Sequence, residues 1–205
     1  MEIVLVGPGR IGEALEARLR VQGHGVQILS RRAYGDFLAP AYDPAPAVSR
    51  VAACDAVLLL AGRFELNGRE EALAQTNVTG PLRVAEALHA RFPQAQTVAF
   101  LDSRIRRPLA VVPPEVRAYL AAKKRLANWV LGAAKAWGRA TGARVNAIAP
   151  GPVLPPPDQA HREKGGACLT PRPTIEDIAR AVQFLLETPS VTGQILYVAA
   201  GQQLL

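Results

Sequence analysis

Cysteine is scarce in this sequence, and the two that occur, Cys54 and Cys168, stand far apart with no histidine cluster near either. A disulfide framework needs several cysteines in a short secreted chain, and a zinc site needs closely spaced Cys and His ligands. Neither pattern is present. We therefore expect neither structural disulfides nor a metal site.

Long apolar runs are also absent. No stretch approaches the roughly 18 consecutive apolar residues that span a bilayer, and the residues after Met1 lack the basic segment and apolar core of a secretion signal. We therefore expect a cytoplasmic protein that does not associate with membranes. The 205 residues, 49% of them apolar and 20% charged, are typical of one globular domain with one sizeable core.

The sequence also lacks basic runs interleaved with aromatic residues, which mark many nucleic-acid-binding surfaces. The formal net charge is +7, but the 24 lysines and arginines are scattered along the chain. The positive charge therefore favours a small anionic cofactor, and not nucleic acid, as the partner.

The sequence does contain a regular alternation of short apolar runs and segments with helical periodicity. This alternation predicts βα units, whose right-handed crossovers place helices on both faces of a parallel sheet. We predict a doubly wound, Rossmann-type α/β fold in a single domain over residues 1–205, with a reduced region between the second and fourth strands. The predicted strands are Glu2–Val6, Gly25–Ser30, Phe37–Tyr42, Ala56–Ala61, Thr97–Asp102, Arg144–Ala149 and Gln194–Ala199. The predicted helices are Arg10–Gln22, Arg69–Arg91, Glu115–Arg139 and Thr174–Leu186.

The first predicted strand runs into a glycine-rich turn, GxGxxG, that opens the first helix. In this context Gly7 allows a tight turn, Gly9 lets a pyrophosphate approach the backbone, and Gly12 permits close packing of helix on strand. Arg10 and Ile11 stand at the helix N-terminus, whose partial positive charge favours phosphate. The turn therefore predicts a dinucleotide site, and a plain βα turn is the alternative.

The second strand ends in Ser30, Arg31 and Arg32, where an NAD site usually has an acidic residue for the ribose 2′-hydroxyl. Two guanidinium groups and a hydroxyl suit a 2′-phosphate, because arginine makes paired, charge-assisted bonds to phosphate oxygens. The expected cofactor is therefore NADP(H). The alternative is that both arginines lie in a solvated turn.

A tyrosine and a lysine, Tyr119 and Lys123, lie four residues apart and so share one face of a predicted helix. The spacing alone is common by chance. Here the pair follows the fifth strand of a nucleotide-binding fold and precedes the Pro150–Gly151 turn that ends the sixth. This placement makes the two side chains candidates for proton transfer beside the nucleotide.

With these motifs in place, the sequence resembles the short-chain dehydrogenase/reductase family from its first strand to its last. The shared features are the glycine-rich turn, Asn77, the Tyr119/Lys123 pair, the Pro150–Gly151 turn and the closing segment Val191–Ile195. The resemblance implies hydride transfer from NADPH to the carbon of a C=N or C=O bond, with Tyr119 as proton donor.

The same resemblance implies roles for further residues. Lys123 would favour the phenolate form of Tyr119 and bind the nicotinamide ribose. Asn77 would interrupt a helix and hold a water in the proton relay, with an ordinary helical asparagine as the alternative. The remaining cofactor-binding residues implied by the resemblance are Ala61, Gly62, Pro150 and Gly151.

Within the family, the chain is most similar to pteridine reductases and dihydromonapterin reductases, which carry an acidic residue where most relatives have a catalytic serine. Asp102 would fill that position, and Ser103 is the alternative. An aromatic residue after the fourth strand holds the pterin in those enzymes, and Phe64 is placed to do so here, with loop packing as the alternative. A stacked ring would gain about 1 kcal/mol beyond burial. The implied substrate is a small, pterin-like molecule bound by Phe64, Asp102 and Tyr119.

The sequence also departs from the family pattern. Leu59 and Leu60 replace the usual asparagine pair after the fourth strand, and the glycine-rich turn is shortened. Two other functions therefore stay open: a general reductase for ketones and aldehydes, and a sensor or scaffold that binds NADPH without catalysis. Apolar residues on the predicted helices Arg69–Arg91 and Glu115–Arg139 favour a homodimer or homotetramer.

Overall fold

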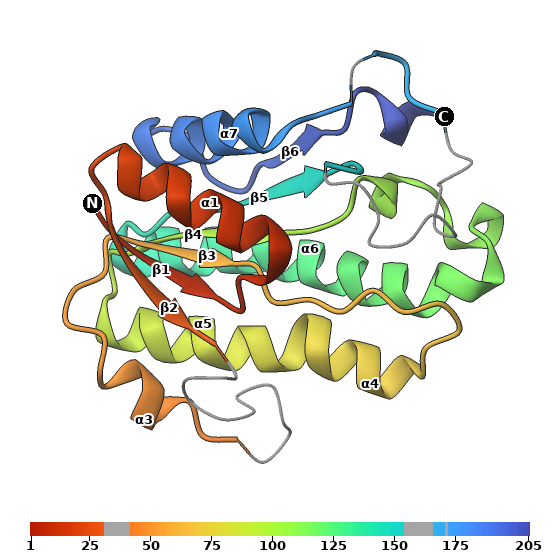
Figure 1. Cartoon of the computed structure of the whole chain (residues 1–205). Helices are drawn as coiled ribbons and strands as arrows, with labels where there is room; N and C mark the ends of the chain where they lie inside the picture. The colour runs from red at the N-terminus through yellow and green to blue at the C-terminus, as the bar shows by residue number, and fades with distance from the viewer. Residues whose placement is uncertain (31–41, 154–165, 171) are drawn as a thin grey trace.

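The computed structural model describes residues 1–30, 42–153, 166–170 and 172–205. Its strands form one parallel sheet in the order β2-β1-β3-β4-β5-β6 (Figure 1). These strands are β1 (Glu2–Val6), β2 (Gly25–Leu29), β3 (Ala56–Leu59), β4 (Gln96–Phe100), β5 (Val145–Pro150) and β6 (Ile195–Val198). They match the predicted first, second, and fourth to seventh strands, so the doubly wound α/β fold is confirmed.

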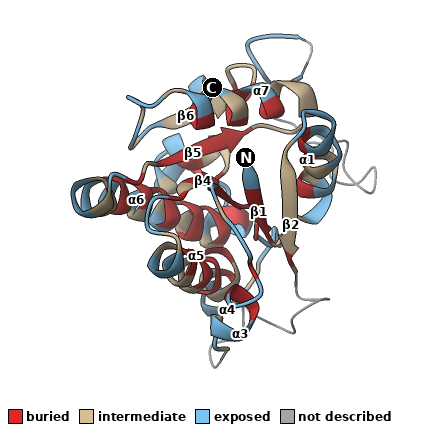
Figure 2. Cartoon of the chain, turned by 90° about the vertical axis from the view of Figure 1, so that its left-hand side faces the viewer, coloured by how far each residue is buried: buried red, intermediate tan, exposed pale blue. Residues whose placement is uncertain are grey.

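Helices cover both faces of the sheet (Figure 1). Helices α1 (Gly9–Val21) and α7 (Ile175–Glu187) pack on one face, and α3 (Ala45–Val48), α5 (Gly80–Arg91) and α6 (Pro114–Thr141) pack on the other. Buried residues gather along the strands and the inward sides of the helices (Figure 2). Because successive strand residues face opposite sides, each strand contributes alternately to the two cores, as Val4 and Leu5 do.

Between β2 and β3, the described residues hold a single helix of four residues, α3, which packs on the core through Ala47 and Val48. The predicted strand Phe37–Tyr42 falls on residues 31–41, which lie outside the described residues, except for Tyr42, which is not in a strand.

The predicted helix Arg69–Arg91 is interrupted. It consists of α4 (Glu70–Ala74), a five-residue π-helical segment (Gln75–Thr79) and α5. Hydrophobic periodicity does not register a single wide turn, whereas the family resemblance implied an interruption at Asn77, which lies in the π-helical segment. Such π segments occur often at functional sites.

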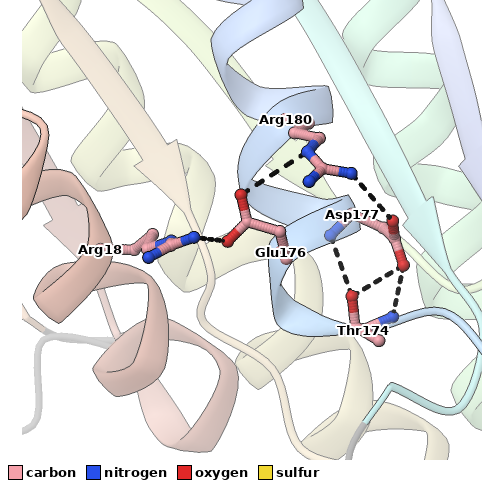
Figure 3. A network of polar contacts seen from close by, with 5 residues as sticks. All are labelled: Arg18, Thr174, Glu176, Asp177 and Arg180. Atoms are coloured by element: carbon pink, nitrogen blue, oxygen red, sulfur yellow. Dashed lines mark hydrogen bonds and ion pairs between the residues drawn. The ribbon is translucent and has the colours of Figure 1, made fainter.

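Helix α7 is joined to α1 by a surface network (Figure 3). Thr174 and Asp177 form a capping box at the start of α7, as their spacing predicts, and these hydrogen bonds lower the pKa of Asp177. Glu176 contacts Arg18 of α1 and, in the same helix, Arg180. In the described part of the chain, no helix is both long and apolar enough to cross a membrane.

Candidate active site

The carboxyl ends of the parallel strands meet at one edge of the sheet. The strand order reverses at β1, which has β2 on one side and β3 on the other. In open parallel sheets, ligands bind in the crevice beyond the carboxyl ends of the strands at such a point. Four segments with predicted site residues begin at this edge, namely 7–12 after β1, 60–64 after β3, 101–104 after β4, and 150–151 at the end of β5.

The glycine-rich turn after β1 depends on its glycines for two different reasons. Gly7 and Gly9 have φ angles of 62° and 52°, which disfavour other residues. A Cβ at Gly7 would lie 2.6 Å from the Cβ of Ala61, whereas a Cβ at Gly9 would meet no atom of the described residues within 4 Å. Gly12 packs against Pro8 and Leu60. Glycine is thus needed at position 7 so that the ends of β1 and β3 can pack together. At position 9, the missing side chain leaves the space beside the backbone open.

This turn fits the phosphates of a dinucleotide. The open space at Gly9 lies at the N-terminus of α1, a helix of 13 residues with no acidic residue in its first turn. Arg10 and Ile11 belong to that first turn, as predicted. Ser30 directly follows β2 beside it, while Arg31 and Arg32 lie outside the described residues.

Asn77 ties the π-helical segment to the loop after β3. Its buried amide accepts a hydrogen bond from the backbone N–H of Arg63 at 3.1 Å and donates to the carbonyls of Arg63 and Leu73 at 3.1 and 2.9 Å. Three hydrogen bonds to backbone groups leave this side chain firmly oriented. The loop that carries Phe64 is therefore anchored by hydrogen bonds to the helical segment that follows it in the sequence.

Gly62 brings Asn77 and Lys123 close together. A Cβ at Gly62 would lie 3.0 Å from both the Asn77 Oδ1 and the Lys123 Nζ atoms. The absence of a side chain there lets the two polar groups approach the same backbone. The small Ala61–Gly62 pair, predicted to bind cofactor, thus also separates the glycine turn from the Asn77 and Lys123 side chains.

Lys123 is buried in helix α6, 4% exposed. Its Nζ atom donates to the carbonyl of Phe100 at 2.9 Å and lies 6.0 Å from the centroid of the Tyr119 ring. Burial lowers the pKa of Lys123 to about 8, against the opposing effect of the Asp102 charge. A lysine in this position can exchange a proton near neutral pH.

Tyr119 lies one helical turn before Lys123 and is 8% exposed. The Phe64 ring meets it edge-on, with 5.1 Å between centroids and 88° between planes, and is itself 46% exposed. The Asn67 N–H donates to the carbonyl of Glu115 at 2.7 Å, which fastens this loop to the start of α6. Phe64 therefore covers the tyrosine and presents its own ring to solvent.

Asp102 and Ser103 have different surroundings. Asp102 follows β4 by two residues and accepts from Arg104 three times, from the backbone N–H at 2.9 Å, Nε at 2.9 Å and Nη2 at 2.8 Å. Ser103 is buried and donates to the Gln202 side chain at 2.6 Å. Asp102 therefore belongs to the cluster that contains Lys123 and Arg104, whereas Ser103 anchors the C-terminal segment.

Arg104 was not singled out from the sequence. Its guanidinium lies 5.5 Å from the centroid of Phe64 while it pairs with Asp102. The structure thus brings together the predicted residues Phe64, Asn77, Asp102, Tyr119 and Lys123, and adds Arg104 to them. Its proximity to Asp102 in the sequence was the only available signal.

The last of the four segments, at the end of β5, belongs to the predicted cofactor site. Pro150 is the last residue of β5, and a Cβ at Gly151 would lie 2.9 Å from the Cα atom of Ala199. The turn is therefore packed against the end of β6. No group of His, Cys, Asp and Glu side chains that could hold a metal ion occurs within the described ranges.

Comparison with known proteins agrees with this geometry. Residues 48–203, more than half of the chain, match the family described as enoyl-(acyl carrier protein) reductase, which belongs to the short-chain dehydrogenases/reductases. The chain is therefore a member of the short-chain dehydrogenase/reductase family, and with it an NAD(P)-dependent oxidoreductase. A search of curated proteins gave no match.

Solved structures show the same fold at low identity. A 3-alpha-hydroxysteroid dehydrogenase from Pseudomonas sp. B-0831, complexed with NADH, is 21% identical over 98% of this chain and 96% of its own, with a TM-score of 0.83. The FolM alternative dihydrofolate reductase 1 from Brucella canis, complexed with NADP, is 23% identical over 100% and 94%, with a TM-score of 0.76. A short-chain dehydrogenase from Burkholderia cenocepacia J2315, in complex with NADP, is 23% identical over 98% and 96%, with a TM-score of 0.83.

Proposed function

We propose that this protein is an NADPH-dependent reductase of a flat, pterin-like ring. The observation that carries the proposal is the position of Phe64, a half-exposed ring held against Tyr119 with Asp102 and its partner Arg104 alongside. A flat ring stacked on Phe64 would lie within reach of the tyrosine. The FolM reductase among the similar structures supports the same substrate class.

NADP(H) is the form of cofactor that we propose. The sequence Ser30-Arg31-Arg32 offers positive charge for a 2′-phosphate, and two of the similar structures contain NADP. When bound, NADPH supplies the hydride. Gly7, Gly9 and Gly12 would hold its phosphates at the start of α1, and Pro150 and Gly151 would line the opposite side of the crevice.

The chain's own residues would supply the proton. Tyr119 donates it from its hydroxyl to the reduced substrate, and the buried Lys123 ammonium stabilises the phenolate that forms. The Phe100 carbonyl fixes Lys123 in this position. Asn77 orients the backbone at Gly62 and Arg63, between the glycine turn and the lysine.

Asp102 is our proposal for the third residue of the site. It acts on Lys123 electrostatically and is oriented by the two hydrogen bonds from the Arg104 guanidinium. The buried Ser103 hydroxyl donates to the Gln202 side chain, which favours Asp102 over Ser103 for this role.

The test is NADPH consumption by the purified protein with dihydropterins and with a panel of ketones and aldehydes. Turnover of dihydropterins that is lost in Tyr119→Phe and strongly reduced in Phe64→Ala and Asp102→Asn is the expected result. Unchanged kinetics in both Phe64→Ala and Asp102→Asn would remove the pterin proposal. Turnover of ketones alone would indicate a general carbonyl reductase, and NADPH binding without turnover of any substrate would indicate a sensor.

We further propose that the protein is a homo-oligomer, a dimer or a tetramer. Helices α5 and α6 lie side by side on one face, and α6 carries an exposed apolar residue, Leu131, that is 51% accessible. Light scattering on a sizing column measures the mass directly, and a monomer at micromolar concentration would contradict this proposal.

A further inference from the structure

Arg104 has no part in the proton transfer proposed above, yet it contacts two residues of the site. Its Nε and Nη2 atoms pair with the two carboxylate oxygens of Asp102, and its guanidinium lies over the Phe64 ring. The Arg104 and Asp102 side chains are only 18% and 14% exposed. The pair is therefore a partly desolvated wall of the site and not a surface ion pair.

The geometry of this wall is specific to arginine. A guanidinium is planar, keeps its charge at all physiological pH values, and can bind a carboxylate with two N–H groups while it stacks on an aromatic ring. Lysine offers a point charge without the plane or the fork. The contacts of Arg104 therefore fix the orientation of Asp102 and the position of Phe64 together.

The pair also presents an acceptor position beside a positive charge. A carboxylate has about four acceptor positions, and Arg104 occupies three of those on Asp102, so one is left for an N–H of a bound molecule. The neighbouring guanidinium attracts an oxygen. An N–H and a C=O next to each other on the edge of a planar ring match this arrangement, whereas a saturated ketone offers neither the N–H nor a ring face.

We propose that Arg104 is a specificity-determining residue, which with Asp102 and Phe64 selects a flat heteroaromatic ring carrying an adjacent N–H and C=O. The inference rests on the proposed function, because it concerns the substrate of the same site. Arg104 would recognise the edge of the ring that carries the N–H and the C=O.

The experiment measures binding without hydride transfer. The protein saturated with NADP⁺ is titrated calorimetrically with biopterin, a flat ring with such an edge, for the wild type, Arg104→Lys and Arg104→Met. The exposed Arg106, two residues further along the same 3-10 helix, provides the matched control Arg106→Met. NADPH affinity, turnover of the best ketone and thermal unfolding are recorded for each variant, and Arg104→Lys keeps the charge should Arg104→Met fail to fold.

Both Arg104 variants should bind biopterin about tenfold or more weakly, since a charge-assisted contact is lost, while the NADPH affinity stays near wild type and the Arg106→Met control binds biopterin as the wild type does. Undiminished biopterin binding in the variants, or no biopterin binding by the wild type, would overturn the inference. So would an equal loss of biopterin binding and NADPH affinity, because Arg104 would then only support the fold.

The two proposals fail in different ways. Dihydropterin turnover by the wild type that is indifferent to Arg104 would leave the reductase in place and remove the role of Arg104. Arg104-dependent binding of biopterin without any turnover of dihydropterins would keep the recognition role and remove the proposed reaction.

Discussion

The two halves of the crevice are built in different ways. At the ends of β1 and β2, the candidate cofactor site is made of backbone and small residues, with Gly7 packed against Ala61 and Gly9 open to solvent. The other half, the candidate catalytic site, is made of large side chains that contact one another: Phe64 from the loop after β3, and Tyr119 and Lys123 from α6. Substitutions should therefore act sterically in the first half and chemically in the second.

The largest chemical effect is expected from Tyr119→Phe, which removes one oxygen and keeps the ring against Phe64. Turnover should fall roughly 100- to 10,000-fold, the usual contribution of a positioned proton donor, while NADPH affinity and the unfolding temperature change little. Steady-state kinetics and fluorescence titration with NADPH measure the two quantities. A variant with a tenth of wild-type turnover or more would mean that another group delivers the proton.

Lys123 should make the stability of the protein depend on pH. Burial lowers its pKa to about 8 from an ordinary value of 10.5, so between these values the folded state binds fewer protons than the unfolded chain. The free energy of unfolding therefore rises with pH across that window, by an amount on the order of 3 kcal/mol, and the full destabilisation is present below it.

The measurement is the difference in unfolding free energy between wild type and Lys123→Met over the same pH range, which cancels the titration of other groups. This difference should shift in favour of the wild type as pH rises. A difference that stays constant would show that the Lys123 ammonium is solvated in the folded protein and does not lose its proton at a lower pH than in the unfolded chain.

The largest steric effect is expected from Gly7→Ala. The new methyl group would lie 2.6 Å from the Ala61 Cβ at a φ of 62°, so β1 and β3 must separate at their ends. The free energy of unfolding should drop by about 3 kcal/mol, and little NADPH binding should remain. Urea unfolding and an NADPH titration check this, and a fully stable variant would contradict the close packing of Gly7 on Ala61.

The same division explains what could be read from the sequence. Strands buried on both faces are continuous apolar runs, and the spacing of Tyr119 and Lys123 places both on one helix face whatever surrounds them, so the fold and this pair were predictable. The contacts of Ser103 with Gln202, 99 residues away, and of Phe64 with Tyr119 depend on how distant segments pack. No local pattern specifies them, which is why Arg104 escaped notice and why Asp102 and Ser103 could not be separated.

The smallest effect on stability is expected from Gly9→Ala, and it tests the first half of the crevice most sharply. Among the described residues, no atom lies within 4 Å of the added methyl group, so the φ of 52° is the unfavourable factor, at about 1 kcal/mol of unfolding free energy. If the space over Gly9 is the path of the pyrophosphate, NADPH affinity should nevertheless weaken, by up to about tenfold.

Gly7→Ala and Gly9→Ala would then lose cofactor for opposite reasons, one because the turn is distorted and the other because an intact turn is obstructed. NADPH binding as tight as in the wild type would show that the phosphates pass elsewhere, and the open position at Gly9 would have no part in the cofactor site.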